Sequence, residues 1–203
     1  PQGHPFKNNP NLKDHQTSDA GFYDLLLHGQ DRAYDVPDLL AVLDQTDWQL
    51  QSFCTPALYD LTRITPRPAD MTDAAAMAVA EKLTGTIRLH VGYALPKGAD
   101  RKIAKGSNRA LIPHLRGVQP AALAKAVAAG KPLPIGADGV KVQARLPKAA
   151  APLIAGINGQ RSLAQIAKAK RMDALSFGMA WTPVETLLCG WGMMLYSSLL
   201  TRR

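Results

Sequence analysis

The sequence predicts a mixed α/β protein built from two modules, residues 1–95 and residues 96–203. With 203 residues, 46% of them hydrophobic, the chain can bury a sizeable core. Helix and strand patterns alternate in the first module, whereas helix patterns dominate the second. The charge divides at the same place. The first module has seven Lys/Arg and twelve Asp/Glu, the second seventeen and four, so their net charges are −5 and +13.

The first module opens with a polar stretch, residues 1–20, that we expect to be an extended arm. A short apolar helix is expected around residues 22–28. A second helix is expected from about Pro37 to about residue 43, because Asp35 is a favourable N-cap and proline fits a first helical turn. Residues 48–53 alternate roughly between polar and apolar side chains, which predicts a strand.

A third helix and a second strand complete the first module. Residues 71–83 are strong helix formers without glycine or proline, and Gly85 follows as a C-cap. Residues 87–93 alternate apolar with polar or small side chains, which predicts a strand. The first module therefore reads helix, helix, strand, helix, strand.

The second module opens with a basic connector over residues 96–117. An alanine-rich helix is expected over 119–129 and ends at Gly130. The pair Asp138-Gly139 is typical of a tight turn and precedes a short strand at 140–144.

Three helices are expected after this strand: at 149–156, at 162–170 with Ser162 as N-cap, and at about 184–200. The last of these carries an apolar run of about 15 uncharged residues. A membrane span needs roughly 20, so a buried terminal helix is expected and no membrane span.

The N-terminal residues and the two cysteines bear on the cellular compartment. The first residues are polar, without the apolar core of a signal peptide and without an initiator methionine, which indicates a piece of a longer chain. Cys54 and Cys189 are far apart and form no CxxC motif. We expect two reduced thiols in a cytoplasmic protein.

Common catalytic and cofactor motifs are missing from the sequence. It contains no Walker loop, GxGxxG, GxSxG or HExxH pattern, and no nucleophile with an adjacent base. His90 and His114 stand alone and are interpreted as structural.

A polar cluster follows the apolar residues 25–27 and consists of His28, Asp31, Arg32 and Tyr34. Three interpretations remain open. The cluster is a substrate-binding site at the edge of a core, or an ion-pair and capping network around Arg32, or part of a metal site. A metal site needs at least one further ligand besides His28 and Asp31.

The basic second module also has more than one interpretation. No acidic residue lies between Asp138 and Asp173, whereas seven basic residues do. Such a surface neutralises nucleic-acid phosphates, but it is also typical of a solvated face, and it could dock on the acidic first module.

Four segments of the first module, together with their order, carry a resemblance to a known family: HPFKNNPNLKDH, DAGFYDLLLHGQDRAYDVPDLLAVL, WQLQSFCTPALYD and GTIRLHVGYAL. Together they resemble the second half of a group of bacterial class I S-adenosylmethionine-dependent methyltransferases. In that group the HPF segment follows the fifth strand of a Rossmann-like sheet. By this resemblance the two predicted strands are its sixth and seventh, an antiparallel pair that finishes the sheet.

The second module resembles the C-terminal extension of the same group. Its segment APLIAGINGQRSLAQIA, residues 151–167, is similar to a signature of small winged-helix domains of the peptide-chaperone type. Asn158 and Gln165 stand where that signature usually has acids, and we expect this change to weaken capping there. The resemblance thus implies a mostly helical, winged-helix-like accessory or regulatory domain.

The resemblance also defines what the chain lacks. The glycine-rich S-adenosylmethionine loop, the acidic ribose-binding residue and the early strands of the family are not in this sequence. We therefore expect no cofactor binding or turnover by this chain alone. S-adenosylmethionine would bind only with the missing N-terminal half, and that half or another copy of the chain is the expected partner.

In such an enzyme the cluster would face the methyl acceptor, for which a peptide or protein is expected. His28 would act as a base oriented by Asp31, Arg32 would pair with an acidic group, and Tyr34 would hydrogen-bond or stack. The alternative is a non-enzymatic basic winged-helix module that binds nucleic acid or a protein partner.

Overall fold

The computed structural model describes residues 18–23, 27, 29, 32–100 and 103–198. Its internal contacts divide the chain into two units, residues 1–34 and residues 35–203. In the first unit, α1 (Asp19–Phe22) begins after Ser18, whose side chain accepts a hydrogen bond from the Gly21 backbone N–H. Helix α1 therefore starts before residue 22, where the sequence predicted it. Residues 1–17 of the predicted arm, and residues 24–26 and 28 of the predicted helix, lie outside the described residues.

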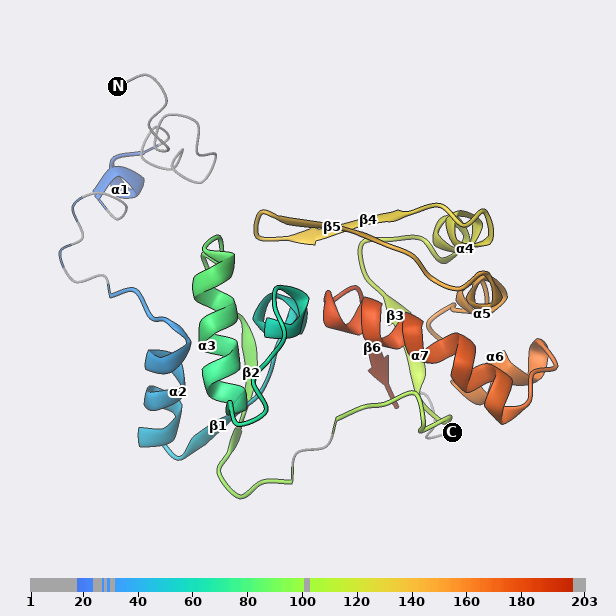
Figure 1. Ribbon diagram of the computed structural model, residues 1–203, viewed down its shortest axis with the longest axis horizontal. Coiled ribbons are helices and arrows are strands. Elements are labelled where there is room, and N and C mark those ends of the chain that lie inside the picture. The colour runs from blue at the N-terminus through green and yellow to red at the C-terminus, as the bar shows by residue number, and fades with distance from the viewer. Residues whose placement is uncertain (1–17, 24–26, 28, 30–31, 101–102, 199–203) are drawn as a thin grey trace. The chain divides into compact units, whose positions relative to one another are not determined.

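The second unit is mixed α/β, as the sequence predicted at this level. Among the described residues it contains helices α2 to α7 and three antiparallel sheets of two strands each (Figure 1). No helix in the described part of the chain is long and apolar enough to cross a membrane.

The first sheet follows α2 (Val36–Gln45), which Asp35 caps by accepting a hydrogen bond from the Asp38 N–H. Strand β1 (Trp48–Phe53) lies where it was predicted and pairs antiparallel with β2 (Gly92–Pro96). The second strand was predicted at 87–93 and is thus displaced toward the C-terminus.

The displacement has a local cause. Trp48 pairs with Pro96, and the register shifts between Leu50 and Ser52. The last residue of β1, Phe53, therefore pairs with Gly92, and residues before Gly92 have no partner in β1. Before that point one further backbone bond extends the pairing, from the Cys54 N–H to the Val91 carbonyl at 2.8 Å.

Helix α3 (Asp73–Thr84) confirms the predicted helix within two residues. The Thr72 side chain caps its start, and Gly85 ends it in the left-handed conformation at φ 64°. Two short 3-10 helices, η5 (Pro56–Tyr59) and η6 (Leu61–Arg63), lie between β1 and α3.

The second sheet was not predicted. It pairs β3 (Ile112–Leu115), in the supposed connector, with β6 (Met194–Ser197). The terminal helix predicted at about 184–200 is therefore wrong. Helix α7 (Ala174–Gly190) begins ten residues earlier and continues through Pro183. Proline removes one helical hydrogen bond, but the helix buries Trp181, Val184 and Leu188, which offsets that loss.

The turn after α7 explains why the chain leaves the helix. Gly192 has φ 65°, and a Cβ atom built there would lie 2.6 Å from the Cys54 carbonyl oxygen. Only glycine fits this close approach in a left-handed conformation. The chain then enters β6 instead of extending the helix.

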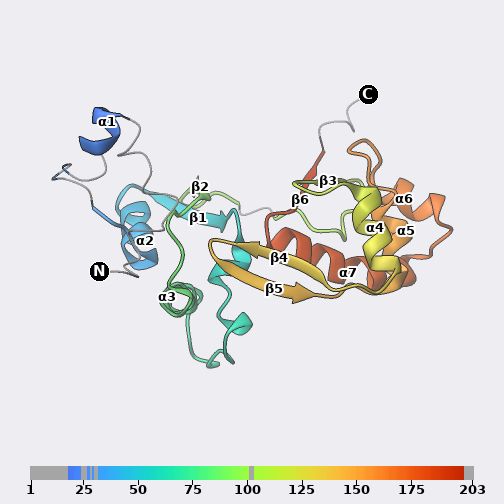
Figure 2. The ribbon, with the colours of Figure 1, turned by 90° about the horizontal axis from the view of Figure 1, so that it is seen from above.

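A hairpin forms the third sheet. Helix α4 (Pro120–Ala128) precedes it, and β4 (Leu133–Ala137) and β5 (Val140–Ala144) are joined by Asp138 and Gly139, both with positive φ. This confirms the predicted tight turn. Figure 2 shows the hairpin beside α7.

Helix α6 (Leu163–Ala169) corrects one expectation from the sequence. After η7 (Lys148–Ala150) and α5 (Ala151–Ile154), Ser162 caps α6 as predicted. Gln165 does not weaken the cap, because its Oε1 accepts a hydrogen bond from the Ser162 N–H at 2.8 Å, completing a capping box.

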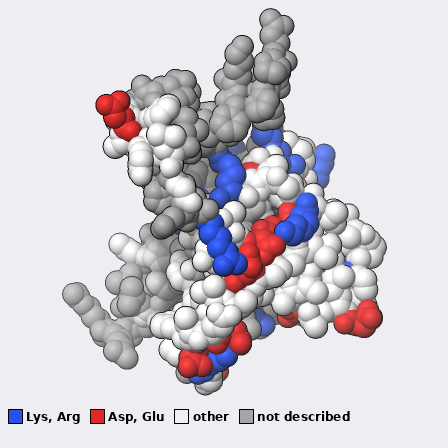
Figure 3. Space-filling model, turned by 90° about the vertical axis from the view of Figure 1, so that its left-hand side faces the viewer, with Lys and Arg blue, Asp and Glu red and all other residues white. Residues whose placement is uncertain are grey.

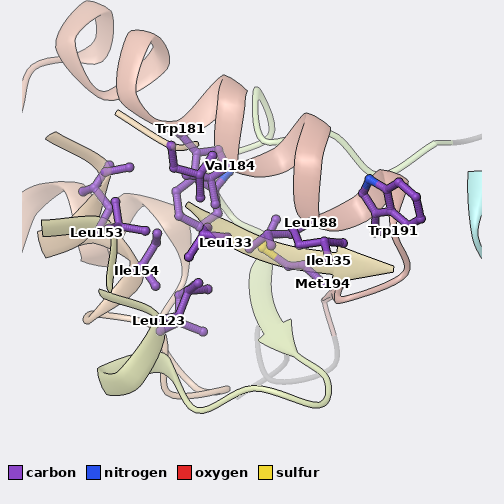
Figure 4. Packing of buried hydrophobic residues seen from close by; sticks show 14 of the residues in the cluster. Leu123, Leu133, Ile135, Leu153, Ile154, Trp181, Val184, Leu188, Trp191 and Met194 are labelled. Carbon is purple, nitrogen blue, oxygen red and sulfur yellow. The ribbon is translucent and has the colours of Figure 1, made fainter. Parts of the chain in front are cut away.

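The core of the second unit forms around α7. Figure 4 shows Trp181, Val184 and Leu188 together with side chains of α4, β4, α5 and β6. The same buried cluster includes Val36 and Phe53, so residues on both sides of position 95 share one core. The module boundary at 95/96 stays a prediction.

Candidate functional site

The predicted polar cluster is described only in part. Arg32 and Tyr34 are exposed, and the Arg32 guanidinium carbon lies 5.2 Å from the centre of the Tyr34 ring. This is cation–π geometry, which holds the guanidinium beside the ring. His28 and Asp31 lie outside the described residues. Their assignment to a substrate-binding site therefore stays a prediction.

Acidic side chains near the start of the second unit are paired with basic ones. Lys82 contacts Asp35, and Lys97 contacts Asp44, each at 2.7 Å. Figure 3 shows acidic and basic side chains side by side on one face of the molecule. Such pairs contribute little to stability.

The structure reveals a pocket that the sequence did not predict, here named the Glu185 pocket. Its volume is about 620 Å³, within the range of small-molecule sites. It lies where β1, Tyr93 of β2 and residues 103–105 meet α7 and β6. Its walls include Phe53, Cys54, Tyr93, Ile103, Lys105, Arg116, Glu185, Cys189, Met194, Leu195 and Tyr196.

Glu185 is the acidic side chain of this wall. Helical spacing puts Trp181, Glu185 and Cys189 on one side of α7. The Glu185 Oε1 atom accepts a hydrogen bond from the Gly106 backbone N–H at 2.6 Å. Within the described part of the chain, Glu185 forms no ion pair with a basic side chain. The carboxylate is thus held in place by a backbone hydrogen bond and not by a basic side chain of the described residues.

Gly106 permits this arrangement because it has no side chain. A Cβ atom at this position would lie 2.7 Å from Trp181 Cδ1 and 3.0 Å from Glu185 Oε2. Gly106 is itself buried. The close approach of backbone to indole and carboxylate therefore depends on glycine.

The phenol of Tyr196 stays neutral in this pocket. Trp181 Nε1 donates a hydrogen bond to the Tyr196 hydroxyl at 2.8 Å. Burial raises the pKa of Tyr196 well above its ordinary value, and the nearby Glu185 carboxylate raises it further.

The thiol of Cys189 is likewise held in its neutral form. Burial, with a further contribution from Glu185, raises its pKa to about 12. Cys54 lines the same pocket, and both cysteines are free. Because the thiolate is the nucleophile, Cys189 is unsuited to covalent catalysis at neutral pH.

A second polar network links several elements of the first module. The Tyr59 hydroxyl lies 2.8 Å from His90 Nδ1, and His90 Nε2 lies 3.1 Å from Glu81 Oε1. Glu81 Oε2 accepts a hydrogen bond from the Val36 N–H. Burial raises the pKa of Tyr59 to about 12, so its hydroxyl keeps its proton at neutral pH. The network joins η5, α3 and the start of α2, which agrees with a structural role for His90.

His114 also has a partner from a distant element. Its Nε2 lies 2.7 Å from the Ser197 Oγ, which links β3 to β6 across the sheet. This contact agrees with a structural role for His114.

Sequence reasoning missed the Glu185 pocket because its walls come from segments far apart in the chain. One signal was present in the sequence. Glu185 is the single acidic residue between positions 174 and 203. A lone acid on a helix that is otherwise apolar requires a partner or a use.

Comparison with known proteins adds no family assignment. No protein-family model matches this chain, and no curated protein matches it significantly.

Proposed function

We propose that this chain is the C-terminal part of a bacterial class I S-adenosylmethionine-dependent methyltransferase. In this proposal residues 1–95 contribute acceptor-binding surface, and residues 96–203 form a winged-helix-like accessory or regulatory domain. The remaining half of the catalytic domain binds the cofactor and is supplied by a longer chain or by a partner.

One observation supports the proposal: in the described part of the chain the sheet of β1 and β2 has two strands and open edges. Among the described residues, β2 pairs with β1 alone. The extended segment that enters β2 exposes three large apolar side chains in alternation: Leu89 is 70%, Val91 50% and Tyr93 57% exposed. Open strand edges with apolar neighbours are usually covered in stable proteins. A larger methyltransferase sheet would provide that cover.

The assignment of roles follows from the chemistry of methyl transfer. When bound, S-adenosylmethionine supplies an activated methyl group, and no residue of this chain is assigned to hold it. Arg32, steadied by the Tyr34 ring, can pair with an acidic group of a peptide or protein acceptor. His28 would take the acceptor's proton, and Asp31 would orient His28.

The test uses a protein in which this chain follows a segment with a glycine-rich strand–loop–helix. We expect methyl transfer to a peptide pool, and a loss of kcat/KM of about a hundredfold or more in His28→Ala and Asp31→Ala. Lys125→Ala changes an exposed side chain of α4 and is the control. Unchanged kcat/KM in both variants, with an unchanged fold, would refute a catalytic role for His28 and Asp31 and would favour a structural role for the cluster.

A non-enzymatic basic module is the second candidate function. It is favoured by the alternation of side chains along β5. Lys141 and Gln143 are exposed, as is Arg145 just after the strand. Val140 and Val142, which alternate with them in sequence, are half-buried. Binding of DNA or RNA that weakens steeply with salt and ignores sequence would support this candidate. No binding at low salt would count against it.

A further inference from the structure

We propose that the Glu185 pocket binds a small organic cation that carries one positive charge and a short apolar tail. This inference concerns a ligand site in the second unit and does not rest on methyl transfer. It follows from three properties of the pocket: its single carboxylate, its apolar walls and the state of its other polar groups.

The carboxylate sets the sign of the ligand's charge. Glu185 is half-buried and is the only acidic residue among those that line the pocket. The Gly106 N–H and the Tyr196 hydroxyl each occupy an acceptor position of the carboxylate, and its two oxygens retain further ones. A half-buried carboxylate without a basic partner in the described part of the chain favours a cationic ligand.

The walls set the shape of the ligand. Phe53 and Met194 are buried, and Leu195 and Ile103 are exposed at 43% and 59%. These apolar side chains can cover an alkyl or aryl tail. The rings of Tyr93 and Tyr196 also line the pocket, and aromatic rings attract ammonium groups.

The wall also includes two neutral polar groups, a thiol and a phenol, and two exposed positive groups. The Cys189 thiol and the Tyr196 phenol stay neutral at pH 7, because burial raises the pKa of both groups. Lys105 and Arg116 are positive but exposed. Solvent around exposed charges weakens their repulsion of a bound cation but does not remove it. A dication would still meet these two groups, which is why a single positive charge fits better.

Calorimetric titration of the full chain at physiological salt tests the proposal with three matched probes: hexylammonium, hexanol and hexanoate. Hexylammonium is expected to bind more tightly than hexanol, and hexanoate most weakly. Glu185→Gln keeps an oxygen that can accept from the Gly106 N–H and removes only the charge. We expect it to weaken hexylammonium binding about ten- to hundredfold and to leave hexanol binding unchanged.

Two further variants keep the result interpretable. Asp44→Asn removes an exposed carboxylate of α2, outside the pocket, and should not change binding. Leu195→Lys adds a positive charge at a partly exposed wall position and should weaken hexylammonium binding even if Glu185→Gln fails to fold. The proposal is overturned if hexanoate binds as tightly as hexylammonium, if folded Glu185→Gln retains wild-type affinity, or if none of the three probes binds saturably.

Discussion

The backbone N–H of Gly106 donates a 2.6 Å hydrogen bond to Oε1 of Glu185, a residue 79 positions further along the chain. This bond joins the basic connector to α7 and fixes the carboxylate of the Glu185 pocket. It requires the connector backbone to pass directly against the Trp181 ring.

Replacement of Gly106 by alanine tests this contact. The added Cβ would lie 2.7 Å from Trp181 Cδ1, so the backbone or the buried indole must move. We expect the free energy of unfolding to fall by about 1–3 kcal/mol, measured by urea denaturation. Ser107→Ala, at an exposed neighbouring position, should change it by less than about 0.5 kcal/mol. Equal stability of the two variants would refute the close contact.

The hydrogen bond between Tyr59 and His90 predicts energetic coupling. Tyr59→Phe removes the hydroxyl without changing the ring that stacks on Phe53 at 3.6 Å. We expect it to lower the free energy of unfolding by about 1 kcal/mol. In a double-mutant cycle with His90→Ala, the two effects should deviate from additivity by about 0.5 kcal/mol or more. Strict additivity would mean that the bond contributes nothing in solution.

Asp35 predicts a dependence of stability on acid pH. The hydrogen bond from Lys82, and then that from the Asp38 N–H, hold the pKa of Asp35 below its ordinary value. Its contribution is therefore complete above the unfolded-state pKa and is lost as the pH falls through the lower folded-state pKa. Asp35→Asn keeps a good N-cap but removes the charge.

Thermal denaturation of wild type and Asp35→Asn between pH 7 and pH 2 measures this effect. Wild type should have the higher Tm at pH 7, and the two values should converge in acid. The pKa of Lys82 is raised by the same pair, so its contribution is lost only at strongly alkaline pH, outside this range. A Tm difference that stays constant down to pH 2 would contradict the assignment.

Cys189 should be chemically inert in the folded protein. Its pKa of about 12 leaves almost no thiolate at pH 8, and burial restricts access. In a Cys54→Ser variant, which leaves Cys189 as the single thiol, we expect labelling by a disulfide reagent to be at least about a hundredfold slower than in urea. Rapid labelling of the native variant at pH 8 would show that the pocket wall is open at this position.

Local signals made much of the fold predictable. Gly85 ends α3, Ser162 caps α6, and Asp138-Gly139 forms the hairpin turn, each through contacts within a few residues. Such elements depend on capping and turn chemistry that a sequence displays directly.

Elements that depend on distant partners were not predictable in the same way. Strand β3 forms because residues 112–115 pair with residues 194–197, and no local sequence pattern predicts that pairing. The sequence predicted a helix that starts at about residue 184, but α7 begins at Ala174 and continues through Pro183, because it buries Trp181 and Leu188. The Glu185 pocket was missed for the same reason, since Gly106 and Glu185 meet only after the chain has folded.

Binding of S-adenosylmethionine is the most direct test of the central claim, that this chain is one part of a methyltransferase. Calorimetric titration should compare the chain alone with a protein that also carries an upstream glycine-rich strand–loop–helix. We expect no binding by the chain alone and saturable binding by the longer protein. Saturable binding by the chain alone, or none by the folded longer protein, would contradict it.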